Sequence, residues 1–240
     1  MIWQAGRLGR VELAFTDRLG GSSEGPWASL NLGTSNGDDP ERVADNLDRL
    51  ARELDVEQIV RMTQVHGAEV AWTDELEPGA IPVADALLTG TPETAVLVRV
   101  ADCVPIVLAA PAQPLAGVVH CGREGLVRGV VPAAVEAMRA RGASTIEAWL
   151  GPRACGRCYE LPQEMVDAVA STVPEARSTT SWGTPAIDVG AGVMAQLTAL
   201  GVRGNDLGAD ECTIEHERWF SYRRQGQDSG RFGAVAVIRP

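Results

Sequence analysis

Three side chains with the chemistry of a metal or nucleophile site stand beside apolar segments of this 240-residue chain. Cys103 precedes one apolar run, His120 ends another, and His66 lies in the motif Gln64-Val65-His66-Gly67. A thiol and an imidazole can act as nucleophile and base, and a thiolate with two imidazoles can hold a metal ion. A glycine follows each histidine within two residues, which lets a ligand or another backbone approach closely.

The simplest interpretation of these residues is structural, because free cysteine is among the most buried residue types. The two apolar runs, Val104–Ala109 and Leu115–Val119, are typical of strands covered on both faces, joined by a Pro-rich corner. We expect this strand pair alone not to bring Cys103 and His120 together. They converge only if the strands lie in different sheets or cross obliquely.

Composition excludes several classes of partner and location. A net charge of −11 argues against a nucleic-acid backbone or an anionic membrane as partner. No apolar run is long enough for a membrane span, and the N-terminus has no signal-peptide pattern. Five cysteines without an export signal favour free thiols or metal ligands in the reducing cytoplasm over a disulfide framework.

Flanking elements can be predicted from caps and periodicity. Asp39 and Pro40 begin an amphipathic helix that runs to about Leu54. A helix is expected from His120 to about Arg141, with Pro132 as a kink or a delayed start. Further expected helices are 162–173 and 188–200. Further expected strands are 11–16, 58–62 paired with 69–72, 95–100, 146–150 and 233–238.

Two segments have a less certain role. The Gly/Ser-rich loop from Gly20 to Gly33, with Arg18 before it and Asn31 in it, is either a surface loop or a substrate lid. The pair Cys155-x-x-Cys158 is weak evidence for zinc, and two incidental thiols or a redox-labile disulfide are the alternatives. His216 lies between two glutamates, and we interpret it as exposed and uninvolved.

Motifs along nearly the whole chain resemble the YfiH, or laccase-domain, family, also called multicopper polyphenol oxidase-like. The motifs occur in the family's order, and QVHG followed by ADCVP and a strand ending in His is a specific combination. The matching segments are Phe15–Arg18, Ser29–Gly33, Gly37–Pro40, Gln64–Gly67, Ala84–Ala86, Ala101–Pro105, His120, Gly151–Pro152, Tyr159–Glu160, Phe220–Arg224 and Gly230–Phe232.

The resemblance implies a single α+β domain over residues 1–240, with mixed β-sheets sandwiched between helices as in the YfiH fold. It also implies a bound Zn²⁺ on His66, Cys103 and His120, which is a suitable zinc set with an open fourth position. Asp102 is the carboxylate nearest to Cys103 in sequence and completes the expected catalytic group, in which it can orient a ligand.

The expected substrate-binding residues are Arg18, Asn31, Gln64, Arg123 and Arg223. One departure from the family concerns this set. The family pattern HAGWRG is here His120-Cys-Gly-Arg-Glu-Gly125, so that Arg123 would have to replace a cation that stands one position later in relatives. Cys121 adds a second thiol beside the expected site.

The resemblance implies a purine nucleoside phosphorylase that acts on adenosine, inosine, guanosine or methylthioadenosine, with possible adenosine deaminase activity. The alternatives are a copper polyphenol oxidase, a Cys-His hydrolase acting on cell-wall precursors, and a zinc-stabilised binding domain. Three histidines are too few for a multicopper site, although one copper in the same site could support weak oxidation in vitro. The expected partners are a nucleoside and phosphate, and the expected state is a monomer or weak dimer.

Overall fold

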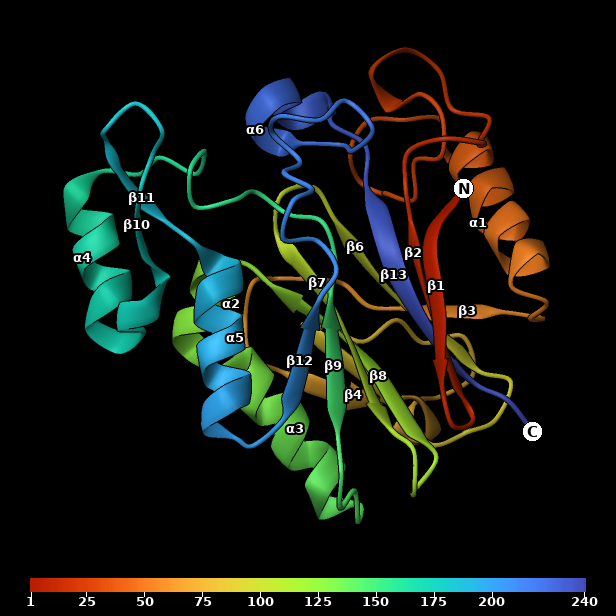
Figure 1. Cartoon of the computed structure of the whole chain (residues 1–240). Helices are drawn as coiled ribbons and strands as arrows, with labels where there is room; N and C mark the ends of the chain where they lie inside the picture. Colours follow the sequence, from red (N-terminus) through yellow and green to blue (C-terminus); the bar gives the residue numbers. More distant parts are fainter.

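Two mixed β-sheets form the centre of the molecule in a computed structural model that describes residues 1–240 (Figure 1). The five-stranded sheet has the order β1 (Ile2–Leu8), β2 (Val11–Thr16), β13 (Phe232–Ile238), β6 (Ala95–Val100), β3 (Ile59–Arg61). The six-stranded sheet has the order β12 (Arg203–Asp206), β9 (Glu147–Leu150), β7 (Val104–Ala110), β8 (Leu115–Cys121), β5 (Ala86–Thr89), β4 (Val70–Trp72).

The central strands β7 and β8 are covered on both faces, as the unbroken apolar runs predict. Every residue of the two strands is buried. Val107 of β7 packs in the core between the sheets, whereas Ile106 and Leu108 pack in a second core under the helices. Alternate side chains of one strand therefore serve two different cores.

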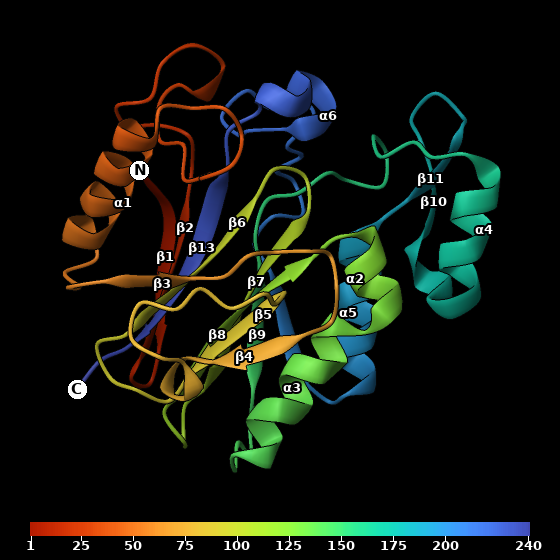
Figure 2. The same ribbon diagram turned by 180° about the vertical axis from the view of Figure 1, so that it is seen from behind.

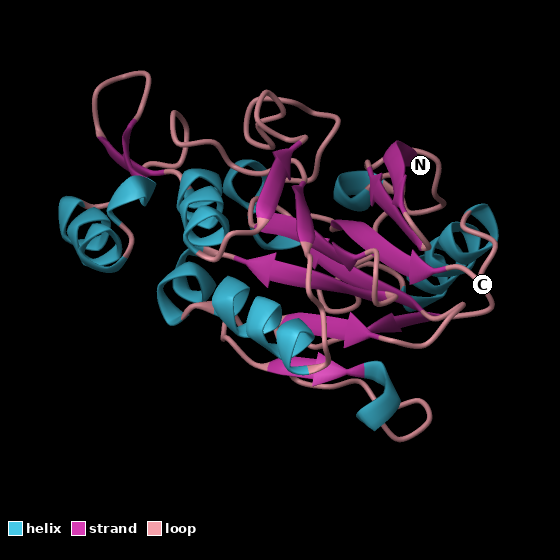
Figure 3. Cartoon of the chain, turned by 60° about the horizontal axis from the view of Figure 1, so that its bottom comes forward, coloured by secondary structure: helices cyan, strands magenta, loops and turns pink.

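Helices cover the outer face of each sheet. Helix α1 (Pro40–Glu53) packs on the five-stranded sheet through Leu50, while α2 (Arg123–Arg128), α3 (Val130–Ala140) and α5 (Val189–Ala199) cover the six-stranded sheet. Figures 2 and 3 show the strands in the middle and the helices on either side. This arrangement confirms the predicted α+β fold with mixed sheets between helices.

The remaining elements lie at the margins. Helix α4 (Gln163–Thr172) and the hairpin β10 (Arg177–Thr179)–β11 (Pro185–Ile187) extend to one side of the molecule, and the short α6 (Tyr222–Gln225) caps one end (Figure 1). Short 3₁₀ helices occupy Gly25–Trp27, Thr73–Glu75, Pro174–Ala176 and Gly226–Asp228. None of the helices has the length and apolar character that crossing a bilayer requires.

Capping residues predicted the helix ends correctly, except that the single helix expected after His120 is two helices. The Asp39 side chain accepts a hydrogen bond from the Glu41 N–H at 2.9 Å and caps α1, as predicted. The expected helix after His120 is divided at Gly129, which has a φ of 79°. Pro132 lies in the first turn of α3, where its missing N–H costs nothing, and so marks a delayed start.

The predicted pairing of the segments 58–62 and 69–72 is wrong. Strand β3 pairs in parallel with β6, and β4 pairs in parallel with β5, so the two segments belong to different sheets. The chain passes from one sheet to the other between β3 and β4, and again between β6 and β7. These two crossovers carry His66 and Cys103.

Candidate functional site

The three predicted metal ligands converge at one place. His66 comes from the β3–β4 crossover, Cys103 from the β6–β7 crossover, and His120 from the end of β8. Cys103 Sγ lies 3.7 Å from His66 Nε2, and the nearest ligand atoms of all three residues lie within 4.8 Å of one another. The two imidazole rings meet edge to face, with centroids 4.7 Å apart.

The β7–β8 hairpin itself brings Cys103 close to His120, contrary to the sequence-based expectation. In its antiparallel register Val104 pairs with Cys121 and Pro105 with His120. The beginning of the first strand in an antiparallel pair faces the end of the second. Cys103, one residue before the pairing starts, therefore lies beside His120 without a second sheet or an oblique crossing.

Asp85 holds two of the three ligands in place through hydrogen bonds, and no role for it was predicted from the sequence. Its carboxylate accepts hydrogen bonds from the backbone N–H groups of Val65, His66 and Gly67 at 3.2, 2.9 and 2.7 Å. These bonds hold His66 at a φ of 59°, a conformation that non-glycine residues seldom adopt. The sequence signal that could have identified Asp85 is a lone carboxylate between two alanines at the start of an apolar segment.

The same carboxylate sets the tautomer of His120. Asp85 Oδ1 lies 2.7 Å from His120 Nδ1, and both side chains are buried. An imidazole that donates its Nδ1–H to a carboxylate presents Nε2 as the free nitrogen, as metal-binding histidines commonly do. Asp85 therefore orients His120 directly and His66 through the backbone.

Electrostatics favour a thiolate in the absence of metal. Burial raises the pKa of the Cys103 thiol, but His120 and His66 outweigh that effect and lower the pKa to about 6. Burial lowers the pKa of His120, but the Cys103 thiolate and Asp85 outweigh it and raise the pKa to about 9. Near neutral pH, the metal-free site thus holds a Cys103 thiolate beside a His120 imidazolium.

A pocket of about 510 Å³ opens over the three residues. Its wall includes four arginines: Arg99, Arg123, Arg223 and Arg231. Arg123 pairs with Glu124 at 3.1 Å, whereas none of the other three has a carboxylate partner within salt-bridge distance. Unpaired arginines that share a pocket in so acidic a chain provide a binding environment for an anion.

Arg99 and Arg231 were missing from the predicted set. The Arg99 guanidinium donates to Thr34 Oγ1 at 2.9 Å and to the Met62 carbonyl at 2.9 Å, so its position is fixed. Its pKa is lowered to about 10 by burial and by the nearby Arg61 and Arg231. A charged residue in the otherwise apolar run 95–100 was the signal that could have identified it.

Besides the three metal ligands, four of the predicted residues line the pocket: Gln64, Asp102, Arg123 and Arg223. The amide of Gln64 is used on the Arg99 backbone, to which it donates at 2.7 Å and from which it accepts at 3.0 Å. Asp102 accepts from Thr213 Oγ1 at 2.6 Å and from the Arg223 N–H at 2.7 Å. Both side chains thus tie together the segments that form the pocket wall.

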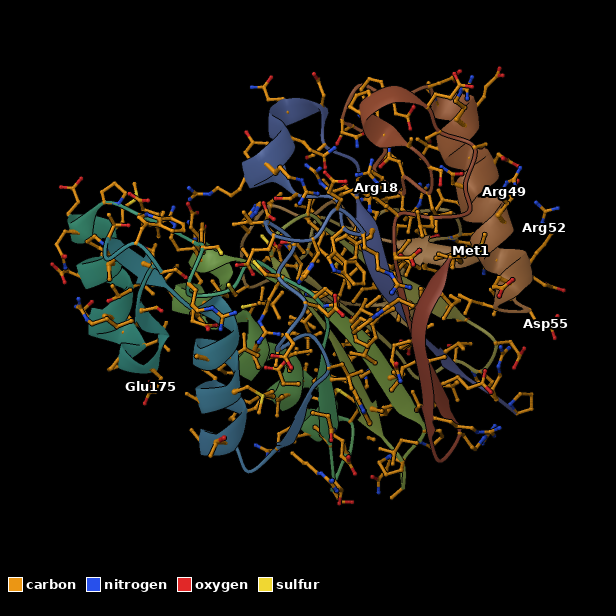
Figure 4. All side chains as sticks on the ribbon, turned by 45° about the horizontal axis from the view of Figure 1, so that its top comes forward. Met1, Arg18, Arg49, Arg52, Asp55 and Glu175 are labelled. Carbon is orange, nitrogen blue, oxygen red and sulfur yellow. The ribbon has the colours of Figure 1, made fainter.

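The structure does not place Arg18 or Asn31 on the pocket wall. Arg18, labelled in Figure 4, lies among the loops at the top of that view. It donates from Nε to the Ala28 carbonyl at 2.7 Å and stacks on the Phe220 ring at 4.5 Å. Asn31 is fully buried, where it donates to Asp38 at 2.8 Å. Both hold the Gly-rich loop in shape, and of the predicted lid only its end, Gly33, reaches the pocket.

Comparisons with known proteins agree over the whole chain. The family described as Multi-copper polyphenol oxidoreductase laccase matches residues 12–239. A purine nucleoside phosphorylase of Streptomyces griseus is 50% identical over 96% of this chain and 95% of its own, and one of Streptomyces coelicolor is 47% identical over 99% and 100%. The crystal structure of YlmD from Geobacillus stearothermophilus superposes with a TM-score of 0.87 at 30% identity, over 100% and 99% of the two chains. A structure of a Neisseria meningitidis protein also has a TM-score of 0.87, at 29% identity and the same coverage.

Proposed function

Because this chain belongs to the laccase-domain family, we propose that it is a zinc-dependent purine nucleoside phosphorylase. The two streptomycete relatives named purine nucleoside phosphorylase match this chain along nearly its full length. One observation on the chain itself carries the proposal: a His-Cys-His ligand set and three arginines without carboxylate partners face the same pocket. Arginines bind phosphate oxygens, and a metal on the three ligands would bind an oxygen of the nucleoside or of a water beside them.

The donor set fits zinc. Zinc bonds of about 2.3 Å to sulfur and about 2.0 Å to nitrogen place the two ligand atoms about 3.6 Å apart in a tetrahedron. The Cys103–His66 distance of 3.7 Å matches this value. Three protein ligands leave one coordination position for water or substrate. When bound there, zinc would polarise an oxygen ligand and make a water a better acid.

Gly122 makes room for this ligand set. A Cβ at this position would lie 2.9 Å from Cys103 Sγ and 2.9 Å from His66 Cδ2, well inside van der Waals contact. The backbone of Gly122 has an ordinary φ of −92°, so space and not conformation requires glycine here. The structure therefore gives a steric reason for a glycine two residues after His120.

We place the phosphate nucleophile at the arginines. Arg99, Arg231 and Arg223 converge on the pocket, and guanidinium groups bind phosphate oxygens bidentately. Asp102 fixes the backbone of Arg223 through its N–H, which makes Asp102 a positioning residue in this proposal. The function of these residues is to hold phosphate in line with the sugar carbon, because phosphorolysis is largely a positioning problem.

Tyr159 is a candidate donor toward the leaving base. It lines the pocket, and Arg223 stacks on its ring at 4.6 Å. Burial and the Cys103 thiolate raise the pKa of Tyr159, although Arg223 acts in the opposite direction. The phenol therefore keeps its proton at neutral pH and can donate a hydrogen bond as negative charge develops on the purine.

The test is base release by the zinc-loaded protein. Adenosine, inosine, guanosine and methylthioadenosine are incubated with and without phosphate, and products are separated by chromatography. We expect a free purine and ribose 1-phosphate (the methylthio derivative from methylthioadenosine) only with phosphate, and loss of both in His120→Ala. Conversion of adenosine to inosine without base release would instead support deamination, and no product from any nucleoside would refute the proposal.

A Cys-His hydrolase is the second candidate, and the depressed pKa of Cys103 favours it. A thiolate beside an imidazolium is the resting state of cysteine nucleophiles. The two candidates respond oppositely to chelation, because metal removal exposes the thiolate but abolishes a zinc-dependent reaction. A multicopper oxidase is not supported, since the third histidine, His216, is exposed and lies outside the ligand set. The need for reduced thiols is consistent with a cytoplasmic location.

A further inference from the structure

We propose a second, structural zinc site formed by Cys155, Cys158, Cys212 and Glu215, separate from the pocket. Ligand atoms of these four residues lie within 4.8 Å of one another. Three sulfurs and one carboxylate oxygen are a complete tetrahedral set with no open position, which is typical of structural zinc. The four residues form the pattern Cys-x-x-Cys and, with 53 residues between Cys158 and Cys212, the pattern Cys-x-x-Glu.

The two halves of the cluster have the same backbone geometry. The Cys155 carbonyl accepts hydrogen bonds from the N–H groups of Cys158 and Tyr159, at 3.0 Å each. The Cys212 carbonyl accepts from Glu215 and His216 in the same way, at 3.2 and 3.0 Å. Each half is therefore a tight turn whose first and last residues present a ligand, and the two turns face each other.

Contacts between the turns support ligation of Cys212. The Cys155 N–H points at Cys212 Sγ at 3.5 Å, a hydrogen bond that favours a thiolate acceptor. The two segments are also joined by a parallel bridge between Arg153 and Cys212. Cys212 is 3% exposed, yet it belongs to none of the three apolar cores. Packing therefore does not explain why a thiol is buried here.

A disulfide accounts for less of the cluster. Any one disulfide uses two of the three sulfurs. It does not explain why a third thiol and a carboxylate lie close to it. Disulfides also rarely persist in the reducing compartment that free ligand cysteines need. A zinc ion uses all four groups at once, and thiolate sulfur selects it over magnesium or calcium.

The position of the cluster indicates what the metal does. The first turn leads directly into Tyr159, and the second leads into α6, which carries Tyr222 and Arg223. All three residues line the pocket. Apart from two isolated bridges, Arg153–Cys212 and Glu160–Ala186, the segments 151–162 and 207–221 contain no strand or helix. The metal would therefore join two irregular segments that shape one side of the pocket.

Cobalt substitution tests the site independently of catalysis. Reduced, metal-free protein is titrated with Co²⁺, and its sulfur-to-cobalt absorption is followed. We expect two ions per wild-type chain, with thiolate bands about three times stronger at the new site, because three sulfurs bind there against one at Cys103. Cys103→Ala should keep only the strong band, and Cys158→Ser should keep only the weak one.

The fourth ligand has its own matched variants. Glu215→Ala should weaken the second ion at least ten-fold, whereas Glu215→His, which supplies another zinc ligand, should retain it. Glu217→Ala, an exposed acid two residues away, should bind like wild type. These substitutions are on the surface, so they remain informative if Cys158→Ser fails to fold.

Three results would overturn this inference. One is wild-type protein that binds a single ion per chain under reductant. Another is Cys158→Ser protein with an unchanged ion count and spectrum. The third is a Cys155–Cys158 or Cys155–Cys212 disulfide, found by mass spectrometry of alkylated protein that was purified under reductant. Each is separate from the nucleoside assay, so the proposed enzyme activity could hold or fail on its own.

Discussion

Replacing Asp85 with asparagine should release the metal while leaving the size of the side chain unchanged. If the amide oxygen takes the place of Oδ1, the NH₂ group faces the N–H groups of Gly67 and Val65. If it takes the place of Oδ2, the NH₂ faces the His66 N–H and His120 Nδ1. In that case His120 must carry its proton on Nε2, the nitrogen needed for metal.

The first orientation sets the NH₂ group against two backbone N–H donors and the second sets it against one, and the magnitude follows from how far these donors are shielded from water. A buried donor left without an acceptor costs about 1–3 kcal/mol, so the metal-free variant should lose about 2–4 kcal/mol of unfolding free energy. For a chain of this size, each kcal/mol lowers the melting temperature by about 2–4 °C. Loss of a carboxylate that orients a metal-bound histidine weakens metal binding by about 10–100-fold.

Two measurements separate these effects. Competition with a fluorescent chelator gives the zinc affinity of folded protein at a temperature well below unfolding, and calorimetry gives the melting temperature with and without zinc. Asp38→Asn is the matched control, since Asp38 also accepts side-chain hydrogen bonds but lies outside the ligand set. Wild-type zinc affinity in Asp85→Asn would refute the role assigned to this carboxylate.

Four further predictions follow from the same geometry. Gly122→Ala should lose most of the bound zinc, measured by metal analysis, because its Cβ would displace Cys103 by more than the ~0.2 Å that ligand bonds tolerate. In metal-free protein, alkylation of Cys103 should be half-maximal near pH 6 instead of about pH 8.5. Because this pKa is depressed by folding, its stabilising effect is present above the unfolded pKa and is lost as the pH falls through about 6, which acid titration of the melting temperature would detect. Arg231→Ala should raise the Michaelis constant for phosphate at least ten-fold, and Arg231→Lys should restore part of it; no change in either would remove Arg231 from the anion site. Arg18→Ala should leave that constant unchanged and lower only the melting temperature, since its guanidinium contacts carbonyls and Phe220.

Local sequence was informative wherever a short segment determines its own structure. The apolar runs of β7 and β8 and the Asp39-Pro40 start of α1 could be predicted because burial and capping act over a few residues. The pairing of β3 with β6 could not, because the crossover between the sheets follows from how two separate hydrophobic faces dock. The approach of Cys103 to His120 was misjudged for a different reason, because the start of β7 and the end of β8 lie side by side in their antiparallel hairpin.

The site shows a similar division. Residue type and the scarcity of histidine singled out His66, Cys103 and His120, and the family resemblance implied that the three bind one metal ion. Arg99, Arg231 and Asp85 were not predicted because charged residues usually lie at the surface. Asp85 is buried and the two arginines are half-buried in the pocket wall, and that placement depends on neighbours from distant segments. Arg18 is the opposite case, since it was predicted to bind substrate but does not line the pocket. From sequence alone, a cation beside a glycine-rich loop can equally bind a ligand or hold that loop in place.

The two crossovers that carry His66 and Cys103 would make capture of the proposed metal a late event in folding. Cys103 and His120 follow His66 by 37 and 54 residues along the chain. All three ligands meet only after the two sheets have packed. A nascent or partly unfolded chain therefore offers no preformed three-ligand site and should bind zinc weakly. The ion would then distinguish finished from unfinished molecules, and nearly all of its binding free energy would stabilise the native state. In a cell that is short of zinc, metal-free protein of lower stability would accumulate, and its half-life would depend on the zinc supply.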